Sequence, residues 1–301
     1  MPKLAIVIPY YKIDFFEETI KSVAEQTNKN FVLYIGNDAS PENPQPIIEK
    51  YFNHNEYHYF GYKENLGGKN LALQWERILE NVTEEWFQIL GDDDVLASNF
   101  VEEFYHSKEY CDDQNIHCIK TVHHHIDEHD YLIRINDYNI NTIEAKELFV
   151  NKYYGIVSSS LSENIFKTEM YRKYRFEKIP LAWGSDDIAI LCFSGYGIIY
   201  YSRNTHVKVR ISTLSISGSE SLNSKKDDAY NIFREKFIIN YAKKFSITFV
   251  NKVVEQYLQY SYKNHHNAKY SVAYYYLKKL KLIYFLKTIK KVHYVNSLTK
   301  S

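Results

Sequence analysis

The sequence predicts an α/β fold with a doubly wound, mostly parallel sheet, followed by a helical, basic C-terminal extension. Over roughly the first 100 residues, short apolar runs that suit buried strands alternate with segments whose apolar residues recur at helical spacing. Turn-forming or acidic residues follow several of these runs. Lysine is concentrated near the end: residues 251–301 hold ten lysines and one glutamate, so in a chain of net charge zero residues 1–250 carry −9.

The first strand is expected at Leu4–Ile8, a continuous apolar run that Pro9 ends. A helix should follow over Asp14–Gln26, with apolar residues on one face and acids in its first turn. The second strand, Phe31–Ile35, leads into the turn-rich loop 36–41.

The alternation continues with a helix at Pro46–Phe52 and a strand at Tyr57–Phe60. The loop Glu64–Asn70 then precedes a helix at Leu71–Leu79, and a short interior strand follows at Trp86–Leu90. Strands and helices in this order predict a nucleotide-binding type of α/β unit.

Three consecutive acids, Asp92, Asp93 and Asp94, follow that interior strand after Gly91. Ligands of open α/β sheets bind at the carboxyl ends of the strands, and Mg²⁺ or Mn²⁺ takes oxygen ligands that it often shares with a substrate phosphate. The acids therefore predict a metal site that could hold a diphosphate. The alternative is an acidic turn whose carboxylates are solvated or cap the next helix.

Composition favours a cytoplasmic enzyme. The 301 residues can bury a sizeable core, and the three cysteines show no paired spacing typical of disulfides or metal sites. The start Met1-Pro2-Lys3 leads directly into a strand-like run without a signal peptide, and no uncharged apolar stretch is long enough to span a bilayer.

Five motifs in a fixed order resemble family 2 glycosyltransferases of the Rossmann-like GT-A fold. They are IVIPYY, GNDAS, ENLGGKN, GDDD and WGSDD, within residues 2–217. The resemblance implies a GT-A domain over residues 1–220, with a nucleotide-sugar half at about 1–96 and an acceptor half at about 97–220. Residues 221–301 would form the helical extension.

The resemblance implies roles for residues around the nucleotide. Pro9 and Tyr11 would line the base, and Asp38 would accept the imide hydrogen of uracil. Asn37 replaces the first acid of the family's Asp-Asp pair, which leaves the identity of the base open. Lys69 would lie near the ribose and diphosphate, or else remain a solvated loop lysine.

The resemblance also gives the acids a register, although Gly91 stands where the family usually has its first aspartate. Asp93 would be the metal ligand, Asp92 would face the ribose, and Asp94 would be a second ligand or an orienting group. A slip of one residue would exchange these roles. His206 would complete the metal site in one alignment, whereas in another Ser212 occupies the matching position and the histidine is structural.

In the WGSDD motif, Asp187 corresponds to the family's general base and Asp186 to the preceding glutamate. A carboxylate there would take the proton of the acceptor hydroxyl, which implies an inverting displacement. Acids are also common at helix starts for dipole reasons alone. Trp183 could stack on an acceptor sugar or lie in the core. Residues 215–226 are expected to form a mobile loop that closes over the donor.

Two other segments invite an interpretation. His123, His124 and His125 are adjacent on an expected strand or loop, so they cannot all converge on one ion; we expect them on the acceptor side or simply exposed. The tail Tyr270–Tyr294 interleaves aromatic and aliphatic residues with six lysines. Such a helix could lie on an anionic membrane surface, pack on the body, or bind nucleic acid.

The sequence therefore predicts an inverting, metal-dependent glycosyltransferase with Mn²⁺ or Mg²⁺ as cofactor and a nucleotide sugar, expected to be a UDP-sugar, as donor. The expected acceptor is a glycan or lipid-linked glycan, as in bacterial surface-polysaccharide assembly, with peripheral contact on the inner face of the cell membrane. Nucleic acid is not expected, because the acidic body would repel it. The alternatives are a sugar-1-phosphate nucleotidyltransferase and a noncatalytic nucleotide-sugar binding protein.

Overall fold

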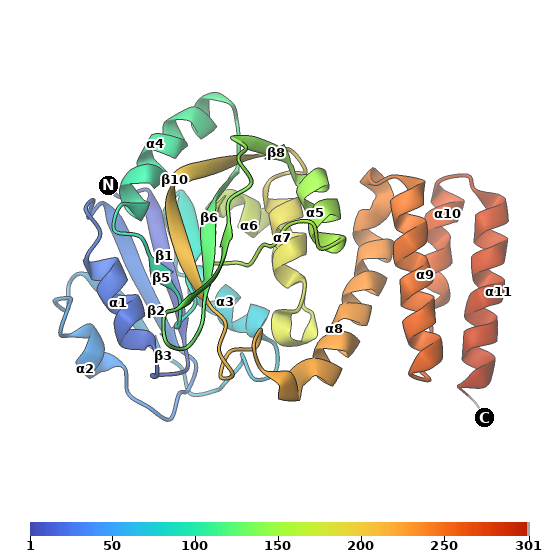
Figure 1. Ribbon diagram of the computed structural model, residues 1–301, viewed down its shortest axis with the longest axis horizontal. Coiled ribbons are helices and arrows are strands. Elements are labelled where there is room, and N and C mark those ends of the chain that lie inside the picture. Colours follow the sequence, from blue (N-terminus) through green and yellow to red (C-terminus); the bar gives the residue numbers. More distant parts are fainter. Residues whose placement is uncertain (300–301) are drawn as a thin grey trace. The chain divides into compact units, whose positions relative to one another are not determined.

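The computed structural model describes residues 1–299. The chain divides into two compact units, Met1–Leu222 and Asn223–Ser301. The first unit is built on one mixed sheet, and the second is helical (Figure 1).

The sheet has the strand order β3-β2-β1-β4-β9-β6-β10-β5. Its first half is parallel and comes from the predicted alternation: β1 (Leu4–Tyr10), β2 (Phe31–Asn37), β3 (Tyr57–Gly61) and β4 (Trp86–Ile89). Strand β1 is longer than expected because it continues through Pro9. The last pair of β1 with β4 is Val7 with Ile89, so Pro9, which lacks an N–H, lies beyond that ladder.

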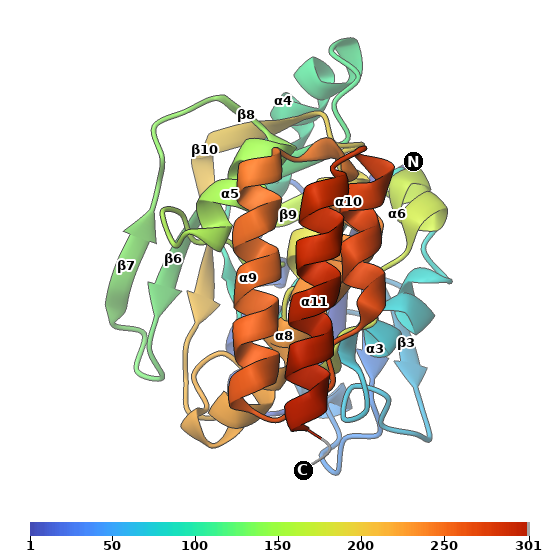
Figure 2. The same ribbon diagram turned by 90° about the vertical axis from the view of Figure 1, so that its right-hand side faces the viewer.

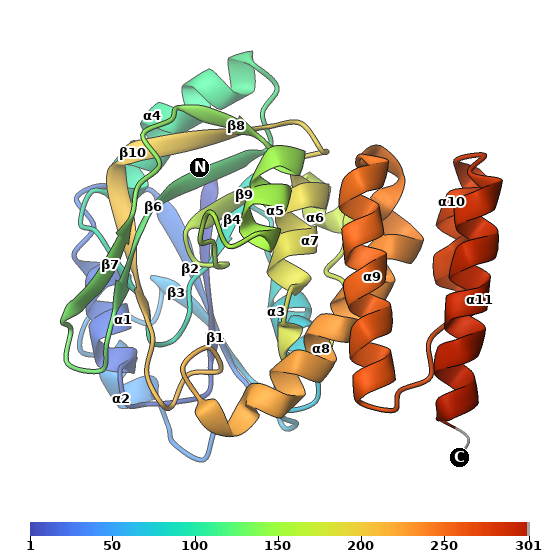
Figure 3. The same cartoon turned by 45° about the vertical axis from the view of Figure 1, so that its right-hand side comes forward.

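Helices cover both faces of this half (Figures 1 and 3). Alternate residues of β1, among them Leu4, Ile6 and Ile8, pack in one core with Phe16 and Ile20. The helices are α1 (Phe16–Ala24), α2 (Gln45–Ile48), α3 (Leu71–Leu79) and α4 (Phe100–Asp113). Three of the four fall where the sequence predicts helices; α4 does not, because its apolar spacing is weaker.

The second half of the sheet was not predicted in detail. Antiparallel β9 (Asn164–Lys167) pairs with both β4 and β6 (Cys118–Ile126), and the long β10 (Ile198–Arg210) runs parallel to β6. Three short strands complete it: β5 (Val95–Leu96), β7 (Leu132–Asn136) and β8 (Thr142–Glu144). The helices of this half are α5 (Ala145–Tyr153), α6 (Thr168–Tyr174) and α7 (Ser185–Phe193).

The segment 215–226, predicted as one loop, has three parts. Ser215 forms a hydrogen-bonded turn with Ser212, a short 3-10 helix covers Glu220–Leu222, and α8 begins at Asn223. Polar side chains hold the turn: the Ser215 hydroxyl donates to the carbonyl oxygen of Ser212 and accepts from the N–H of Gly218.

The C-terminal unit contains α8 (Asn223–Lys236), α9 (Ile247–Lys263), α10 (Tyr274–Lys278) and α11 (Leu282–Leu298) (Figure 2). Aromatic rings of Phe237, Phe245 and Phe249 pack together, and Val292 and Val295 of α11 are buried. The expected single helix over Tyr270–Tyr294 is wrong: the chain breaks between α10 and α11, where Leu280 has a φ of 55°. Among the described residues, no helix is long and apolar enough to cross a membrane.

Candidate functional site

A cleft of about 490 Å³ opens at the carboxyl ends of β1, β2 and β4. This is the edge of a parallel sheet at which ligands usually bind. Its walls include the ends of these strands, the loop before α3, the segment before β9 and the residues that follow β10. Residues of the predicted site that line it are Pro9, Tyr11, Asp38, Asp92, Asp93 and Asp94.

Asp92 ties the acidic turn to the end of β1. Its Oδ2 accepts hydrogen bonds from the backbone N–H groups of Tyr11, at 2.7 Å, and Lys12, at 2.8 Å. Burial raises the pKa of Asp92, although both hydrogen bonds favour the charged carboxylate. Asp92 therefore fixes the turn while still facing the cleft.

Asp94 is held from two other elements. Its Oδ1 accepts from the backbone N–H of Arg210 at 2.9 Å, and its Oδ2 accepts from the hydroxyl of Ser162. Ser162 in turn accepts from the N–H of Gly91 at 3.2 Å. Burial raises the pKa of Asp94 to about 6. The turn is thus bound to both β10 and the segment before β9.

Asp93 differs from its neighbours because, within residues 1–299, its carboxylate has no hydrogen-bond or ion-pair partner. Burial and the adjacent carboxylates of Asp94 and Asp92 raise its pKa well above the usual range. A divalent cation would offset this accumulation of negative charge, so the acids fit a metal of the Mg²⁺ or Mn²⁺ type.

Glycine at position 91 keeps this space open. A Cβ on Gly91 would lie 2.9 Å from Oδ2 of Asp94 and 3.0 Å from Oδ1 of Asp93. A side chain there would point at both carboxylates. The family usually has an aspartate at this position, so this cleft has one carboxylate fewer than the usual family motif would supply.

Arg210, which sequence reasoning missed, braces the acidic turn from the end of β10. Its side chain is fully buried, and its Nε donates to the carbonyl oxygen of Asp93 at 3.1 Å. The guanidinium also pairs with Glu18 at 2.6 Å and with Asp130 at 2.8 Å. Sequence spacing gives no signal for these contacts, because Arg210 and its three partners come from four separate segments.

Asp38 lines the cleft, and its carboxylate also forms hydrogen bonds and an ion pair within the protein. Its Oδ1 accepts from the N–H of Leu66 at 2.8 Å and its Oδ2 from the N–H of Gly67 at 2.7 Å, and Arg77 pairs with the carboxylate. Arg77 also stacks on the ring of Tyr62, 3.7 Å from its centroid. Asp38 therefore holds the loop before α3 against the end of β2.

Four residues of the predicted site, Lys69, His206, Asp186 and Asp187, do not line the cleft. Lys69 is exposed and pairs with Glu64, whereas Lys12, which was not singled out, lines the cleft wall. His206 stacks on His124 with ring centroids 4.2 Å apart. Burial and the neighbouring His124 lower the pKa of His206 to about 4. Among the described residues, no cluster of three His, Cys, Asp or Glu side chains forms a metal site.

Asp186 and Asp187 lie in the first turn of α7, after Gly184, whose φ of 94° suits glycine. Both carboxylates pair with Lys152 of α5, at 3.0 Å for Asp186. Burial raises the pKa of Asp187 to about 7, although Lys152 counteracts this effect. Neither acid lines the cleft, but Leu181, just before them, does. The sequence did not reveal Lys152 as the partner of these two acids.

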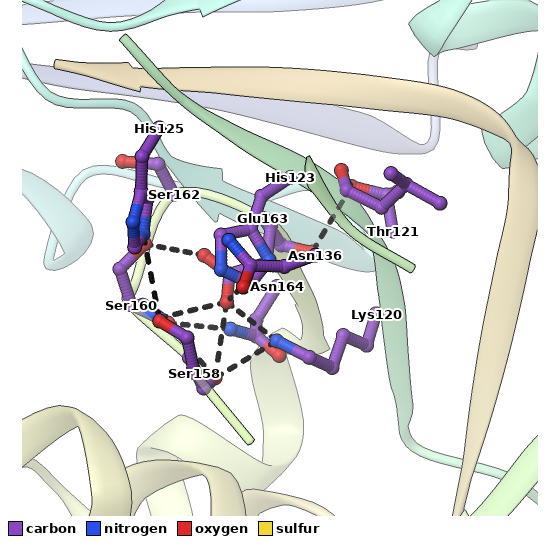
Figure 4. Close-up of polar contacts among 12 residues, drawn as sticks. Lys120, Thr121, His123, His125, Asn136, Ser158, Ser160, Ser162, Glu163 and Asn164 are labelled. Carbon is purple, nitrogen blue, oxygen red and sulfur yellow. Dashed lines mark hydrogen bonds and ion pairs between the residues drawn. The ribbon is translucent and has the colours of Figure 1, made fainter. Parts of the chain in front are cut away.

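A buried polar cluster includes Ser160 and Ser162 (Figure 4), which line the cleft together with Leu161. At its centre, Glu163 and Lys120 form an ion pair in which both side chains are fully buried. Glu163 also accepts from the N–H of Ser160 at 2.7 Å. Burial would raise the pKa of Glu163, but Lys120 and the other donors hold it well below its usual range.

The three adjacent histidines fall on β6 and have different environments. His123 is fully buried, with its Nδ1 3.6 Å from Glu163, so an exposed position is wrong for it. Burial lowers the pKa of His123 to about 3. His125 lies 3.4 Å from the hydroxyl of Ser158 (Figure 4), and His124 faces His206.

Comparison with known sequences supports one family. A family model described as Glycosyl transferase family 2 matches residues 5–180. An uncharacterized glycosyltransferase of Rickettsia typhi is 34% identical over 102 residues, which are 34% of this chain and 30% of that protein. One of Rickettsia conorii is 33% identical over 100 residues, which are 33% of this chain and 16% of that protein. The matched part is therefore less than a third of either relative.

Solved structures share the fold at low identity. TarS 1–349 of S. aureus in complex with UDP-GlcNAc has a TM-score of 0.60 at 14% identity, over 98% of this chain and 90% of that chain. The mannosyltransferase PcManGT from Pyrobaculum calidifontis in complex with GDP-Man and Mn²⁺ has a TM-score of 0.54 at 12% identity. The match covers 97% of this chain and 87% of that chain. These likenesses confirm the predicted GT-A fold with its helical C-terminal region. Since the family model matches more than half of the chain, the protein belongs to glycosyl transferase family 2.

Proposed function

We propose that this protein transfers a sugar from a nucleotide-sugar donor, a UDP-sugar, to a glycan or lipid-linked glycan, with inversion at the anomeric carbon. The observation that carries the proposal is the unpaired Asp93 carboxylate in a cleft at the ends of the parallel strands. Supporting it, two proteins of similar fold are described in complex with UDP-GlcNAc and with GDP-Man and Mn²⁺.

In this proposal the nucleotide lies between the end of β1 and the loop before α3. Pro9 and Tyr11 form one side of the base pocket, and Oδ2 of Asp38 accepts the imide hydrogen of uracil. That oxygen has one protein donor, the N–H of Gly67, and keeps capacity for a second. Asp92 faces the ribose.

Lys12 is better placed than Lys69 to face the donor diphosphate. Lys12 lines the cleft, where its ammonium donates to the carbonyl oxygen of Leu214, whereas Lys69 pairs with Glu64. A lysine ammonium is a compact point charge that suits phosphate. The role first given to Lys69 therefore passes to Lys12 in this proposal.

Asp93 and Asp94 would hold Mn²⁺ or Mg²⁺ together with the donor phosphates. Such ions are commonly bound through one or two carboxylates plus a substrate phosphate, so a third protein ligand is not required. His206 would have to leave its stack on His124 to join them. A bound ion would offset the charge that develops on the departing diphosphate.

Asp187 would act as the general base. It would remove the proton from the acceptor hydroxyl while that oxygen bonds to the anomeric carbon and the bond to the diphosphate breaks. A carboxyl with a pKa of about 7 is well matched to this role near neutral pH. Asp186 and Lys152 would hold it in position through their shared ion pairs.

The basic C-terminal unit supports a cytoplasmic protein that contacts the inner face of the cell membrane, where a lipid-linked acceptor would be found. A sugar-1-phosphate nucleotidyltransferase is less favoured, because it would need a glycine-rich, basic loop where this chain has Pro9-Tyr10-Tyr11-Lys12. A noncatalytic binding protein would have no need of a general base.

Calorimetric titration with UDP, with and without Mn²⁺, tests the donor site before the sugar is known. Binding should require Mn²⁺, and Asp93→Ala should weaken it about tenfold or more. Asp113→Ala, an exposed acid of α4, is the matched control. Absence of UDP binding in both conditions would contradict a uridine donor.

The base is tested by transfer from a UDP-sugar. Asp187→Asn should lower kcat by roughly 10²–10⁴-fold, the usual contribution of a general base, and leave UDP affinity nearly intact. Turnover at the normal rate would remove Asp187 as the base. Asp113→Asn again serves as the control.

A further inference from the structure

The connection from α10 to α11 lies at one end of the C-terminal unit (Figure 2). Large apolar side chains are exposed there. Leu280 is 90% exposed, Ile283 68% and Leu282 59%. With Leu277 and Leu286, which are also exposed, they form what we call the apolar tip. Exposed apolar side chains gathered in this way mark an interaction surface more often than isolated ones do.

The helix break explains why the tip is uncovered. The buried residues of α11, Thr288, Val292 and Val295, recur at helical spacing and face the other helices of the unit. Leu282, Ile283 and Leu286 lie on another face of its first turns. Leu280 adopts a positive φ in the connection, which is unfavourable for leucine, and its side chain is left in the open.

Lysines surround the tip. Lys278, Lys279, Lys281 and Lys287 are all exposed, and none has an ion-pair partner among residues 1–299. The sequence contains no acid after Glu255, so no carboxylate of this segment neutralises them. The tip is therefore an apolar surface within a positive field.

A pocket of about 370 Å³ adjoins the tip within the same unit. It is lined mainly by apolar and aromatic side chains, with one lysine: Ile239, Ser271, Tyr274, Tyr275, Leu277 and Lys278. Leu277 belongs both to this pocket and to the tip. The pocket could hold a single aliphatic chain whose anionic head remains beside Lys278.

We propose that the apolar tip docks on an anionic lipid bilayer, with its leucines and isoleucine among the acyl chains, its lysines on lipid phosphates, and one acyl chain in the adjoining pocket. This is the pattern of interfacial membrane binding, which combines apolar insertion with electrostatic attraction. The inference names the surface for the membrane contact proposed above, and it can be tested without donor or acceptor.

Two other binding partners fit the tip less well than a bilayer does. A second copy of this chain would bring the same four lysines to the tip, and like charges would oppose the contact. Single-stranded nucleic acid would be attracted by the lysines, and Tyr284, which is 44% exposed between them, is an aromatic ring that already stacks on Tyr276. The five side chains of the tip are aliphatic, however, and offer no stacking surface for bases. An anionic bilayer satisfies both the charge and the apolar surface.

Co-sedimentation of the full chain with vesicles tests the proposal. We expect binding to phosphatidylcholine vesicles that contain phosphatidylglycerol, and little binding to phosphatidylcholine alone. Lys279→Gln with Lys281→Gln should lower the affinity by about 30-fold, since each lysine near the surface contributes about fivefold. Lys225→Gln with Lys263→Gln removes the same charge from exposed positions outside the tip and should have a much smaller effect.

The apolar part is tested by Leu280→Ser with Ile283→Ser, which should lower vesicle affinity at least about tenfold through lost apolar insertion. Because both side chains are largely exposed, a folding defect is not expected, and circular dichroism together with unchanged UDP binding would verify the fold. The proposal would be overturned if this variant bound vesicles as tightly as the wild-type protein does. It would also be overturned if the wild-type protein formed a dimer without lipid and the variant were a monomer. If the wild-type protein bound UDP but not the anionic vesicles, the membrane-docking proposal would be rejected and the proposed donor site would stand.

Discussion

Burial and the ammonium of Lys152 act in opposite directions on the pKa of Asp187. Burial raises the pKa of Asp187 to about 7, and the ammonium of Lys152 opposes a further rise. Because only the ionised carboxylate can serve as the proposed general base, the proposal predicts that activity increases as pH rises through about 7. Burial would lower the pKa of Lys152 itself, but its two carboxylate partners raise it, so it remains charged over this range.

Lys152→Gln should therefore move the acid limb of the kcat/KM profile to higher pH. The reason is that the Asp187 carboxylate loses its positive partner while it stays buried. Below the new midpoint, activity should fall about tenfold per pH unit. Lys146→Gln on the same helix, which removes a lysine paired with exposed Glu144, should leave the midpoint unchanged. An unshifted profile for Lys152→Gln would separate this lysine from the base.

Glu163 shows how much one buried charge can matter for stability. Glu163→Gln leaves Lys120 buried without a counter-charge, which should cost about 3–5 kcal/mol of unfolding free energy. Urea denaturation measures this loss. Adding Lys120→Met should recover part of it, because the unpaired charge is gone while the amide can still bond Ser160. A double variant less stable than the single one would show that the ion pair is not the cause.

At the scale of an element, the loop before α3 depends on a close approach of its backbone to Asp38. A Cβ added at Gly67 would lie 2.6 Å from Oδ2 of Asp38, so the loop or the carboxylate must shift. Since the loop forms one wall of the cleft, the shift reaches the proposed donor site directly.

Gly67→Ala should accordingly weaken UDP binding about tenfold or more, a loss of roughly 1.4 kcal/mol. Gly61→Ala is the matched control, because its Cβ would make only an ordinary contact with Tyr59 at 3.5 Å. Calorimetric titration compares the two variants. Equal affinities would mean that the loop does not position the nucleotide.

At the scale of the whole molecule, the cleft and the basic helices belong to different units of the chain. Every residue that lines the cleft precedes Leu222, whereas the apolar tip lies entirely in the second unit. Each unit also has its own apolar core.

A chain ending at Leu222 should therefore keep metal-dependent UDP binding and lose vesicle binding. Titration with UDP and co-sedimentation with anionic vesicles measure the two properties separately. If the shortened chain folds, as judged by circular dichroism, yet fails to bind UDP, the donor site requires the helical unit.

The sequence predicted the parallel half of the sheet well, since apolar runs and turn residues are local signals. It also identified the acidic turn that the structure places in the cleft. It did not predict β9 or the length of β10, because their pairing with distant strands decides their extent. The single C-terminal helix was a wrong prediction, because the break at Leu280 has no glycine or proline to mark it.

By itself, the sequence determined the family, the order of the first strands and helices, and the residue types available for donor binding, because these follow from local pattern and motif order. Only the tertiary structure decided which charges meet. Lys152 reaches Asp187, Arg210 reaches the acidic turn and Lys120 reaches Glu163 across long intervals of sequence. Such partners are set by packing in three dimensions, and burial then sets the strength of their interactions and the protonation of each group.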